Sequence, residues 1–293
     1  MHPARAISSL IGIVLLGSLD LGAQAQPANQ ESAEPPSTET PAPSAASPWA
    51  GTVELYGFAP IRSTGTTTVP VGNTSFSTDT DLSLGDVLSK LKWATSIRGS
   101  IENERIGLLT DLSYVKLGQY NSTTGQRGIF TGQAEVTAVQ GIYDLALRYR
   151  FGDRETAVGQ PGQFSVIPYA GIRIIDAQLD VSAQVDVGNV ISFQREGSFG
   201  RTWVQPLIGT QATVFLSPRL RAFARADIGG FNLSGTDDLS GNAQIGLGYA
   251  IGNSTDLNIS WRYLGLDYNN GDTPDSGFSS YQNGVEIGLK FFF

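Results

Sequence analysis

The C-terminal stretch 281–293 constrains the fold more than any other part of the sequence. Apolar residues occupy almost every second position, and mostly glycine or polar residues stand between them. This alternation predicts a β-strand with one apolar and one polar face, because successive side chains of a strand point to opposite sides. The apolar face carries Val285, Ile287, Leu289, Phe291 and Phe293. One two-faced strand is not stable alone, so the preceding chain must supply strands that pair with it.

The N-terminus has the pattern of an export signal followed by a polar tail. A short basic start precedes an apolar run at 6–19, and Ala23-Gln24-Ala25 then fits a small-residue cleavage site. We therefore predict a secretory signal peptide over 1–25. The alternative, a membrane anchor, is disfavoured because the apolar run is too short to span a bilayer as a helix. Residues 26–48 are rich in Pro, Ser, Ala and Glu and lack aromatic residues, which predicts a disordered periplasmic tail.

Period-two alternation recurs throughout 49–293. It predicts strands at 51–61, 93–102, 106–117, 134–151, 164–187, 201–216, 220–230, 241–251, 255–266 and 281–293. The connections after the second, sixth and eighth of these strands are very short, and most others are longer. Such alternation predicts an all-β fold, an antiparallel up-and-down transmembrane β-barrel of about 10 strands. A soluble β-sandwich is the alternative, but it would expose the polar faces, which here carry charges of both signs.

Three local features interrupt this pattern. The stretch 66–73 predicts a small hairpin, and 86–91 predicts a short helix that Ser83 would start. The apolar positions change from even to odd numbers at Ile174 and Ile175. A β-bulge would produce that change, so we predict one there.

Composition excludes several classes of function. The chain has no Cys, and its single His and single Met are His2 and Met1, within the predicted signal peptide. Histidine general bases and His- or Cys-dependent nucleophiles are therefore excluded, and we predict that the protein is not an enzyme. The formal net charge is -8 and no basic patch occurs, which argues against nucleic acid as a partner.

Acidic residues gather in the expected loops. They are Asp79, Asp81, Asp237, Asp238, Asp272 and Asp275. Carboxylates of this kind can bind Ca²⁺ or Mg²⁺, but their spacing matches no defined calcium loop. We interpret them as a solvated acidic rim and predict no metal and no cofactor.

Several short stretches resemble a family of bacterial outer-membrane β-barrel proteins of uncharacterised function. They are Thr80-Asp81-Leu82-Ser83-Leu84, Val87-Leu88-Ser89-Lys90-Leu91, Gly107-Leu108-Leu109-Thr110-Asp111-Leu112-Ser113-Tyr114, Ala170-Gly171-Ile172-Arg173, Trp203-Val204-Gln205-Pro206-Leu207-Ile208-Gly209, Arg225-Ala226-Asp227-Ile228-Gly229-Gly230-Phe231 and Tyr263-Leu264-Gly265-Leu266-Asp267-Tyr268. The chain departs from the family at Ile106, where Trp is frequent, and at Gln205, where Asp is frequent. The resemblance implies a barrel in the cell outer membrane of a Gram-negative-type bacterium and supplies no catalytic site.

The polar strand faces predict the residues of the barrel lumen. The candidates are Glu54, Arg98, Glu102, Asp111, Asp144, Arg148, Arg173, Arg221, Arg225, Asp227, Asp256, Arg262, Glu286 and Lys290. They would line a pore or form a plug. Two functions follow: a small porin-like channel for ions or small solutes, or a closed structural or surface-interaction barrel that acts through its extracellular loops.

Membrane placement also predicts partners. We expect both termini in the periplasm, and outer-membrane lipid around the barrel. The apolar C-terminal residues from Val285 to Phe293 would serve as an assembly signal. The barrel assembly machinery and periplasmic chaperones would bind the chain during its biogenesis.

Overall fold

The computed structural model describes residues 47–71, 73–124, 130–187, 191–234 and 236–293. The predicted signal peptide, and the predicted tail up to residue 46, lie outside these residues. The described strands are β1 (Trp49–Val71), β2 (Thr74–Ser83), β3 (Leu91–Asn103), β4 (Ile106–Thr124), β5 (Phe130–Tyr149), β6 (Phe151–Gly152), β7 (Phe164–Val187), β8 (Ile191–Ser217), β9 (Leu220–Gly229), β10 (Asp237–Ala250), β11 (Thr255–Asn269) and β12 (Gly277–Phe292). A short helix, α1 (Leu84–Lys90), lies between β2 and β3.

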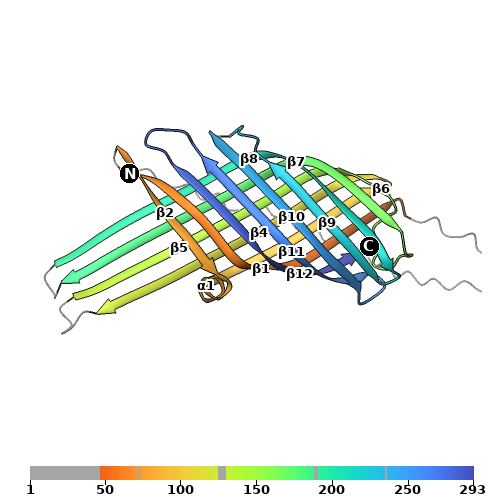
Figure 1. Cartoon of the computed structure of the whole chain (residues 1–293), viewed down its shortest axis with the longest axis horizontal. Helices are drawn as coiled ribbons and strands as arrows, with labels where there is room; N and C mark the ends of the chain where they lie inside the picture. The colour runs from red at the N-terminus through yellow and green to blue at the C-terminus, as the bar shows by residue number, and fades with distance from the viewer. Residues whose placement is uncertain (1–46, 72, 125–129, 188–190, 235) are drawn as a thin grey trace, which may run out of the picture. The chain divides into compact units, whose positions relative to one another are not determined.

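The strands form one closed antiparallel barrel (Figure 1). Sequence neighbours pair from β3 around to β12, β12 pairs with β1, and β1 pairs with β3. Ten strands complete this circuit, while β2 pairs with β1 alone and β6 with β7 alone. The predicted up-and-down barrel of about 10 strands is thereby confirmed.

Each end of the barrel has its own character. We call the end with the tight turns at 104–105, 218–219 and 251–254 the turn end, and it also holds the start of β1 and the end of β12. At the opposite, extended end, β4, β5, β7 and β8 run beyond the other strands (Figure 1). No helix among the described residues is long and apolar enough to cross a membrane.

Strand β11 shows how polarity is distributed across the barrel wall. Toward the turn end, Ile259, Trp261 and Tyr263 face outward and are exposed, while Ser260 and Arg262 between them are buried in the lumen. Toward the extended end the pattern reverses, because Leu264, Leu266 and Tyr268 are buried. We use the name "belt" for the section whose outward-facing residues are apolar. We use the name "extension" for the section whose inward-facing residues are apolar.

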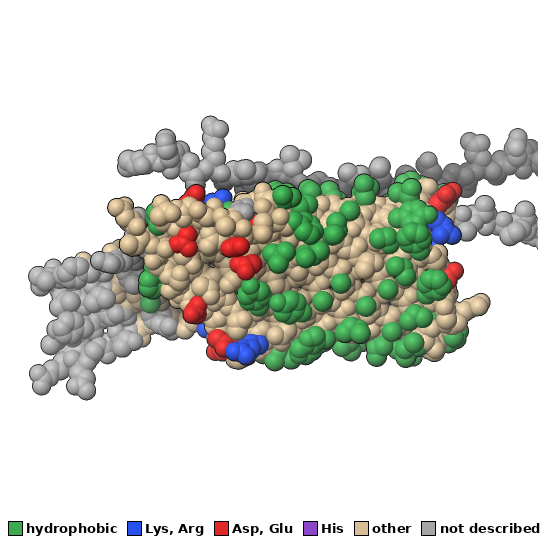
Figure 2. Space-filling model, turned by 45° about the horizontal axis from the view of Figure 1, so that its top comes forward, with side chains coloured by type: hydrophobic (Ala, Val, Ile, Leu, Met, Phe, Trp, Pro, Cys, Tyr) green, Lys and Arg blue, Asp and Glu red, His purple; other side chains and the backbone are tan. Residues whose placement is uncertain are grey.

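The outer surface follows the same division. Figure 2 shows hydrophobic side chains spread over the surface toward the right, and acidic side chains gathered mainly toward the left. The right is the side of the turn end, where the C-terminus lies in Figure 1. The belt is therefore an apolar band that adjoins the turn end.

The predicted bulge in β7 was wrong. The register of β7 against β5 and β8 runs without a shift through Ile174 and Ile175. The apolar positions change parity because β7 passes from the belt into the extension, where Ile175 and Ala177 are fully buried. The wall shifts register in β1 instead, between Pro60 and Arg62 opposite β12.

Several expected loops are strand. The pairing of β4 with β5 continues to Thr124 and Thr131, and that of β7 with β8 continues to Val187 and Ile191. Their polar, glycine-rich sequences resemble loops because these strands belong to the extension, whose outer face is polar. The predicted hairpin at 66–73 is confirmed as part of a longer pairing of β1 with β2.

The predicted short helix is also confirmed, shifted by two residues at its start. Ser83 is the N-cap of α1, and its side chain accepts a hydrogen bond from the backbone N–H of Asp86. The Asp86 carboxylate in turn accepts from the backbone N–H of Ser83 at 3.0 Å, which completes a capping box.

Candidate functional site

Charged side chains fill the lumen of the belt. The fourteen residues predicted to face the lumen all point into the barrel. All but Arg98 are buried, and the side chain of Arg98 is 11% exposed. They come from strands all around the barrel, so the lumen holds charges of both signs at close range.

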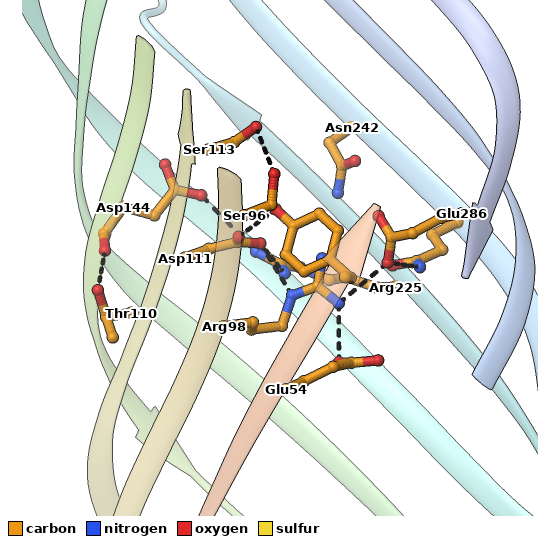
Figure 3. A network of polar contacts seen from close by, with 12 residues as sticks. Glu54, Ser96, Arg98, Thr110, Asp111, Ser113, Asp144, Arg225, Asn242 and Glu286 are labelled. Carbon is orange, nitrogen blue, oxygen red and sulfur yellow. Dashed lines mark hydrogen bonds and ion pairs between the residues drawn. The ribbon is translucent and has the colours of Figure 1, made fainter. Parts of the chain in front are cut away.

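Arg98 on β3 is the centre of this arrangement (Figure 3). Its guanidinium lies 3.1 Å from Glu54, 2.9 Å from Asp111 and 3.3 Å from Glu286. Asp111 also accepts from Arg225 at 2.6 Å, and Arg225 comes from β9 across the barrel. These contacts therefore cross the lumen from β1 and β12 through β3 and β4 to β9.

A second set of ion pairs continues the network. Arg173 on β7 lies 2.7 Å from Asp144 on β5 and 2.7 Å from Asp227 on β9. The hydroxyl of Tyr169 donates to Asp227 at 2.9 Å and accepts from Arg225 at 2.9 Å. Arg225 thus joins the two sets of contacts.

Two smaller groups of contacts lie on the β10–β12 side of the lumen. Arg262 pairs with Glu286 at 2.8 Å, and Arg221 pairs with Asp256 at 2.6 Å. Arg221 also donates to Asn258 at 3.0 Å, while Asn258 donates to Glu54 at 2.6 Å. This side of the wall is thereby tied to β1.

At the turn end, Glu155 joins the ion pairs of the lumen. The residue lies in the connection from β6 to β7, and its carboxylate pairs with Arg148 at 2.9 Å and Lys290 at 2.9 Å. Burial alone would raise the pKa of Glu155, but the charges of Lys290 and Arg148 lower it below its usual value. Arg148 also reaches Glu102 at 3.3 Å. Strand periodicity could not identify Glu155, because the residue belongs to a turn.

Arg150 is a further lumen residue absent from the sequence-based set. It is buried, lies 2.9 Å from Glu102 and donates to the backbone carbonyls of Glu104 and Gly152. The signal for it was present in the sequence, because Arg150 continues the alternation of Asp144 and Arg148. Arg150 lies within the predicted strand 134–151, on the polar face of that strand.

The extension is filled by apolar side chains instead. Ile142, Ile175, Trp203, Leu266 and Tyr268 form a buried cluster. The rings of Trp203 and Tyr268 lie 4.6 Å apart between centroids. Within this cluster the packing resembles the core of a soluble protein.

The acidic loop residues are mostly engaged by neighbours. Asp81 pairs with Arg62 at 2.8 Å, and Asp79 accepts from Thr66 at 2.7 Å. Asp238 departs from the expected solvated rim, because it is fully buried and accepts from Trp203 and Gln205. Within the described ranges, no group of three or more acidic, His or Cys side chains is arranged to hold a metal ion.

The predicted assembly residues lie on the outer face of the closing strand. Ile287, Leu289, Phe291 and Phe293 are exposed there. Phe293 exchanges two backbone hydrogen bonds with Gly51, at 2.8 and 3.0 Å, where β12 meets β1. Their recognition by assembly factors stays a prediction.

Comparison with known proteins supports the fold. No protein-family model and no curated protein matches this sequence. The solved structure of the outer membrane protease OmpT from Escherichia coli is similar, with a TM-score of 0.50 and 10% identity over 84% of this chain and 97% of that chain. The CymD monoaromatic hydrocarbon channel gives a TM-score of 0.29 at 8% identity, over 84% of this chain and 89% of CymD. Ail of Yersinia pestis gives 0.27 at 8% identity, over 84% of this chain and 99% of Ail.

The likeness to OmpT shows the fold, which is that of the outer-membrane β-barrels. The fold that the sequence resemblance implied is therefore confirmed. At such low identity the likeness carries no activity to this chain, and the TM-scores of CymD and Ail are too low to support an argument. The expectation that the chain is not an enzyme stays a prediction.

Proposed function

We propose that this chain is an integral outer-membrane barrel whose belt lies in the bilayer and whose lumen is closed by its own ion pairs. It would act at its extended end rather than as an open channel. The exposed apolar side chains of the belt support the membrane placement, because lipid is the solvent in which such a surface is stable. Short turns mark the periplasmic side of such barrels, so we place both termini in the periplasm.

The observation that carries the closed lumen is the set of ion pairs around Arg98 and Arg225. These two arginines come from nearly opposite strands, β3 and β9, and share Asp111 at 2.9 and 2.6 Å, while Arg98 also pairs with Glu54 at 3.1 Å and Glu286 at 3.3 Å. Removal of one partner from a buried pair of this kind costs about 3–5 kcal/mol, because an uncompensated charge remains. The network therefore resists the opening of a continuous water path.

A porin-like channel for ions or small solutes is the second candidate. Four buried polar atoms have no hydrogen-bond partner among the described residues: Arg98 Nη2, Arg148 Nε, Gln205 Oε1 and Asp256 Oδ1. Three of them belong to charged lumen side chains, so an ion or water could be coordinated in the lumen. Conduction would still require the ion pairs around Arg98 to separate.

Planar-bilayer conductance of the refolded mature chain distinguishes the two candidates. We expect no channel conductance from the wild-type barrel in symmetric salt. The double variant R98A/R225A should open, because it removes both cations that cross the lumen. T95A is the matched control, since Thr95 lies on the outward face of β3, three residues before Arg98. Steady openings of a folded wild-type barrel would instead establish the channel.

A further inference from the structure

The wall of the barrel is interrupted between β1 and β3. The pairing of β1 with β3 ends at Leu55 and Ile97, and the pairing of β1 with β2 begins at Arg62 and Ser83. Along 56–61, β1 therefore has a strand partner only on its β12 side. The facing part of β3, 91–96, pairs only with β4. A gap in the hydrogen-bonded wall separates these two segments.

Helix α1 lies beside this gap. It connects β2 with β3, and Val87 on it is buried while Leu88 is 57% exposed. Pro60 lies in the unpaired segment of β1 and has no N–H to satisfy, which suits an open edge. Side chains of α1, rather than a paired strand, thus border the wall at this place.

Behind the gap lies a cavity of about 510 Å³. Pockets of about 300–1,000 Å³ are typical of sites for small molecules. Apolar side chains from five elements line much of it, among them Val87, Val115, Ile142, Leu264 and Phe278. Its lining ends at Tyr56 and Arg262, which belong to the ion-pair network of the belt.

The lining includes residues from both sides of the wall. Val115 and Ile142 face the interior, whereas Gly57, Thr95 and Ile287 lie on outward positions of their strands. The cavity therefore communicates with the outer surface through the gap. On β3 the opening lies beside Trp93, which faces outward and is 61% exposed. The opening thus adjoins the apolar belt where the belt meets the extension.

We propose that this cavity binds a single hydrocarbon chain of a membrane amphiphile, which enters sideways from the bilayer through the opening between β1 and β3. The inference rests on the proposed placement of the belt in the bilayer. Ser, Thr and Gln side chains contribute to the lining, but most of its accessible surface is apolar, and such a surface favours a hydrocarbon over an ion or a sugar. The position of the opening favours lipid as the source, because Ile287 and Trp93 beside it are exposed to whatever surrounds the belt.

The polar groups at the floor do not supply a free charge for a head group. Tyr56 donates to Asp111 at 2.6 Å, and Arg262 donates to Glu286 at 2.8 Å and to Asn242 at 2.8 Å. The chain end would therefore reach the floor, and the head group would stay at the opening. This arrangement selects for chain length and not for head-group charge.

Photolabelling tests the proposal in the intact mature barrel. The protein is refolded into vesicles of phosphatidylcholine that carries a diazirine near the end of one acyl chain, irradiated, and mapped by peptide mass spectrometry. We expect label on inward residues such as Val115, Ala138 and Leu264, in addition to outward residues of the belt. Label confined to outward residues would overturn the proposal. A lack of outward label would contradict the membrane placement itself, and with it the inference.

Closing the gap tests the route. The chain has no Cys of its own, so G57C/T95C can be bridged across the gap by a short bismaleimide. The bridge should abolish the inward label and leave the outward label unchanged, while the two single-Cys variants with the same treatment keep both. Inward label that persists in the bridged protein would show entry from the extended end and overturn the lateral route.

A filled cavity supplies a test that does not depend on the bridge. Ala138 lines the cavity from β5. A138W should remove the inward label from Val115 and Leu264, and conductance should remain as in the wild type. A138W with undiminished inward label would contradict the cavity as the binding site.

Discussion

Arg173 and Ile175 stand two residues apart on the same face of β7, both point inward, and both are almost completely buried. Arg173 is held by Asp144 and Asp227, whereas Ile175 packs in the apolar cluster of the extension. Their outward neighbours differ in the opposite sense, with an exposed Ile172 before Arg173 and the carboxylate of Asp176 after Ile175. The chemistry of the interior therefore changes together with that of the outer face.

The interiors of the belt and of the extension should lose stability in different ways when a side chain is removed. In the belt, the loss of one charge leaves its partners buried and unpaired. In the extension, the loss of an apolar side chain leaves a cavity. Substitutions in the two sections, and two further substitutions of charged residues, compare how much each section contributes to stability and to closure of the lumen.

The largest effect is expected for D111A in the belt. Asp111 accepts from Arg98, Arg225 and Tyr56, so its removal leaves Arg98 and Arg225 without a shared carboxylate. We expect a loss of about 3–5 kcal/mol in the free energy of unfolding. Urea unfolding in vesicles measures this loss. D267A, which removes a half-exposed carboxylate of β11, is the control. A change as small as that of the control would mean that the network is not coupled.

L266A in the extension is expected to rank second. Leu266 is 1% exposed within the apolar cluster. Truncation of a buried Leu costs about 2–5 kcal/mol, through lost burial and the cavity that remains. The same unfolding measurement applies, and conductance should stay silent because the ion pairs of the belt are untouched. Openings in L266A would mean that the extension, and not the network, closes the lumen.

E155Q at the turn end tests the contribution of charge alone. The pKa of Glu155 is lowered in the folded protein, so its ionised form stabilises the fold above the unfolded value of about 4.3. As pH falls below that value, the stabilisation is lost progressively toward the lower folded pKa. We expect E155Q to be less stable than the wild type at pH 7, with a difference that shrinks below about pH 4. A difference independent of pH would assign its effect to packing.

The smallest effect is expected for D81N in the pairing of β1 with β2. Asp81 and Arg62 pair at 2.8 Å, but their side chains are 60% and 65% exposed. Water and salt screen such a pair, so its removal should leave stability unchanged within error. A loss comparable to that of D111A would contradict the distinction between surface and lumen pairs.

The predictability of the fold follows the same division. In the belt, alternation such as that of Ile259, Ser260 and Trp261 has the polarity of a membrane barrel, and the sequence located these strands. In the extension the polarity is inverted, so the phase change at Ile175 resembled a bulge and the polar outer faces resembled loops. Side chains still alternate between the two faces of each strand there. Which face points inward depends on the medium around the barrel, and the sequence does not state that medium.

The candidate site was predictable to the extent that it lies on strands. Arg98, Asp111 and Arg225 follow from the polar face of their strands, while their mutual pairing depends on register across the barrel. Glu155 enters the lumen from a turn, where no periodicity exists. The gap beside α1 could not be predicted from the sequence either. It depends on where the pairing of β1 with β3 ends and its pairing with β2 begins.

The junction of Gly51 with Phe293 has a consequence for how the barrel forms. Most neighbouring strands in the wall are consecutive in sequence, so hairpins can form as the chain becomes available. The seam between β1 and β12 joins the two ends of the described barrel, and it must wait for the last residues. Until then the sheet has two unpaired edge strands, whose free backbone N–H and C=O groups can pair with other chains. A chain shortened by its final strand would be a template for aggregation rather than a smaller barrel.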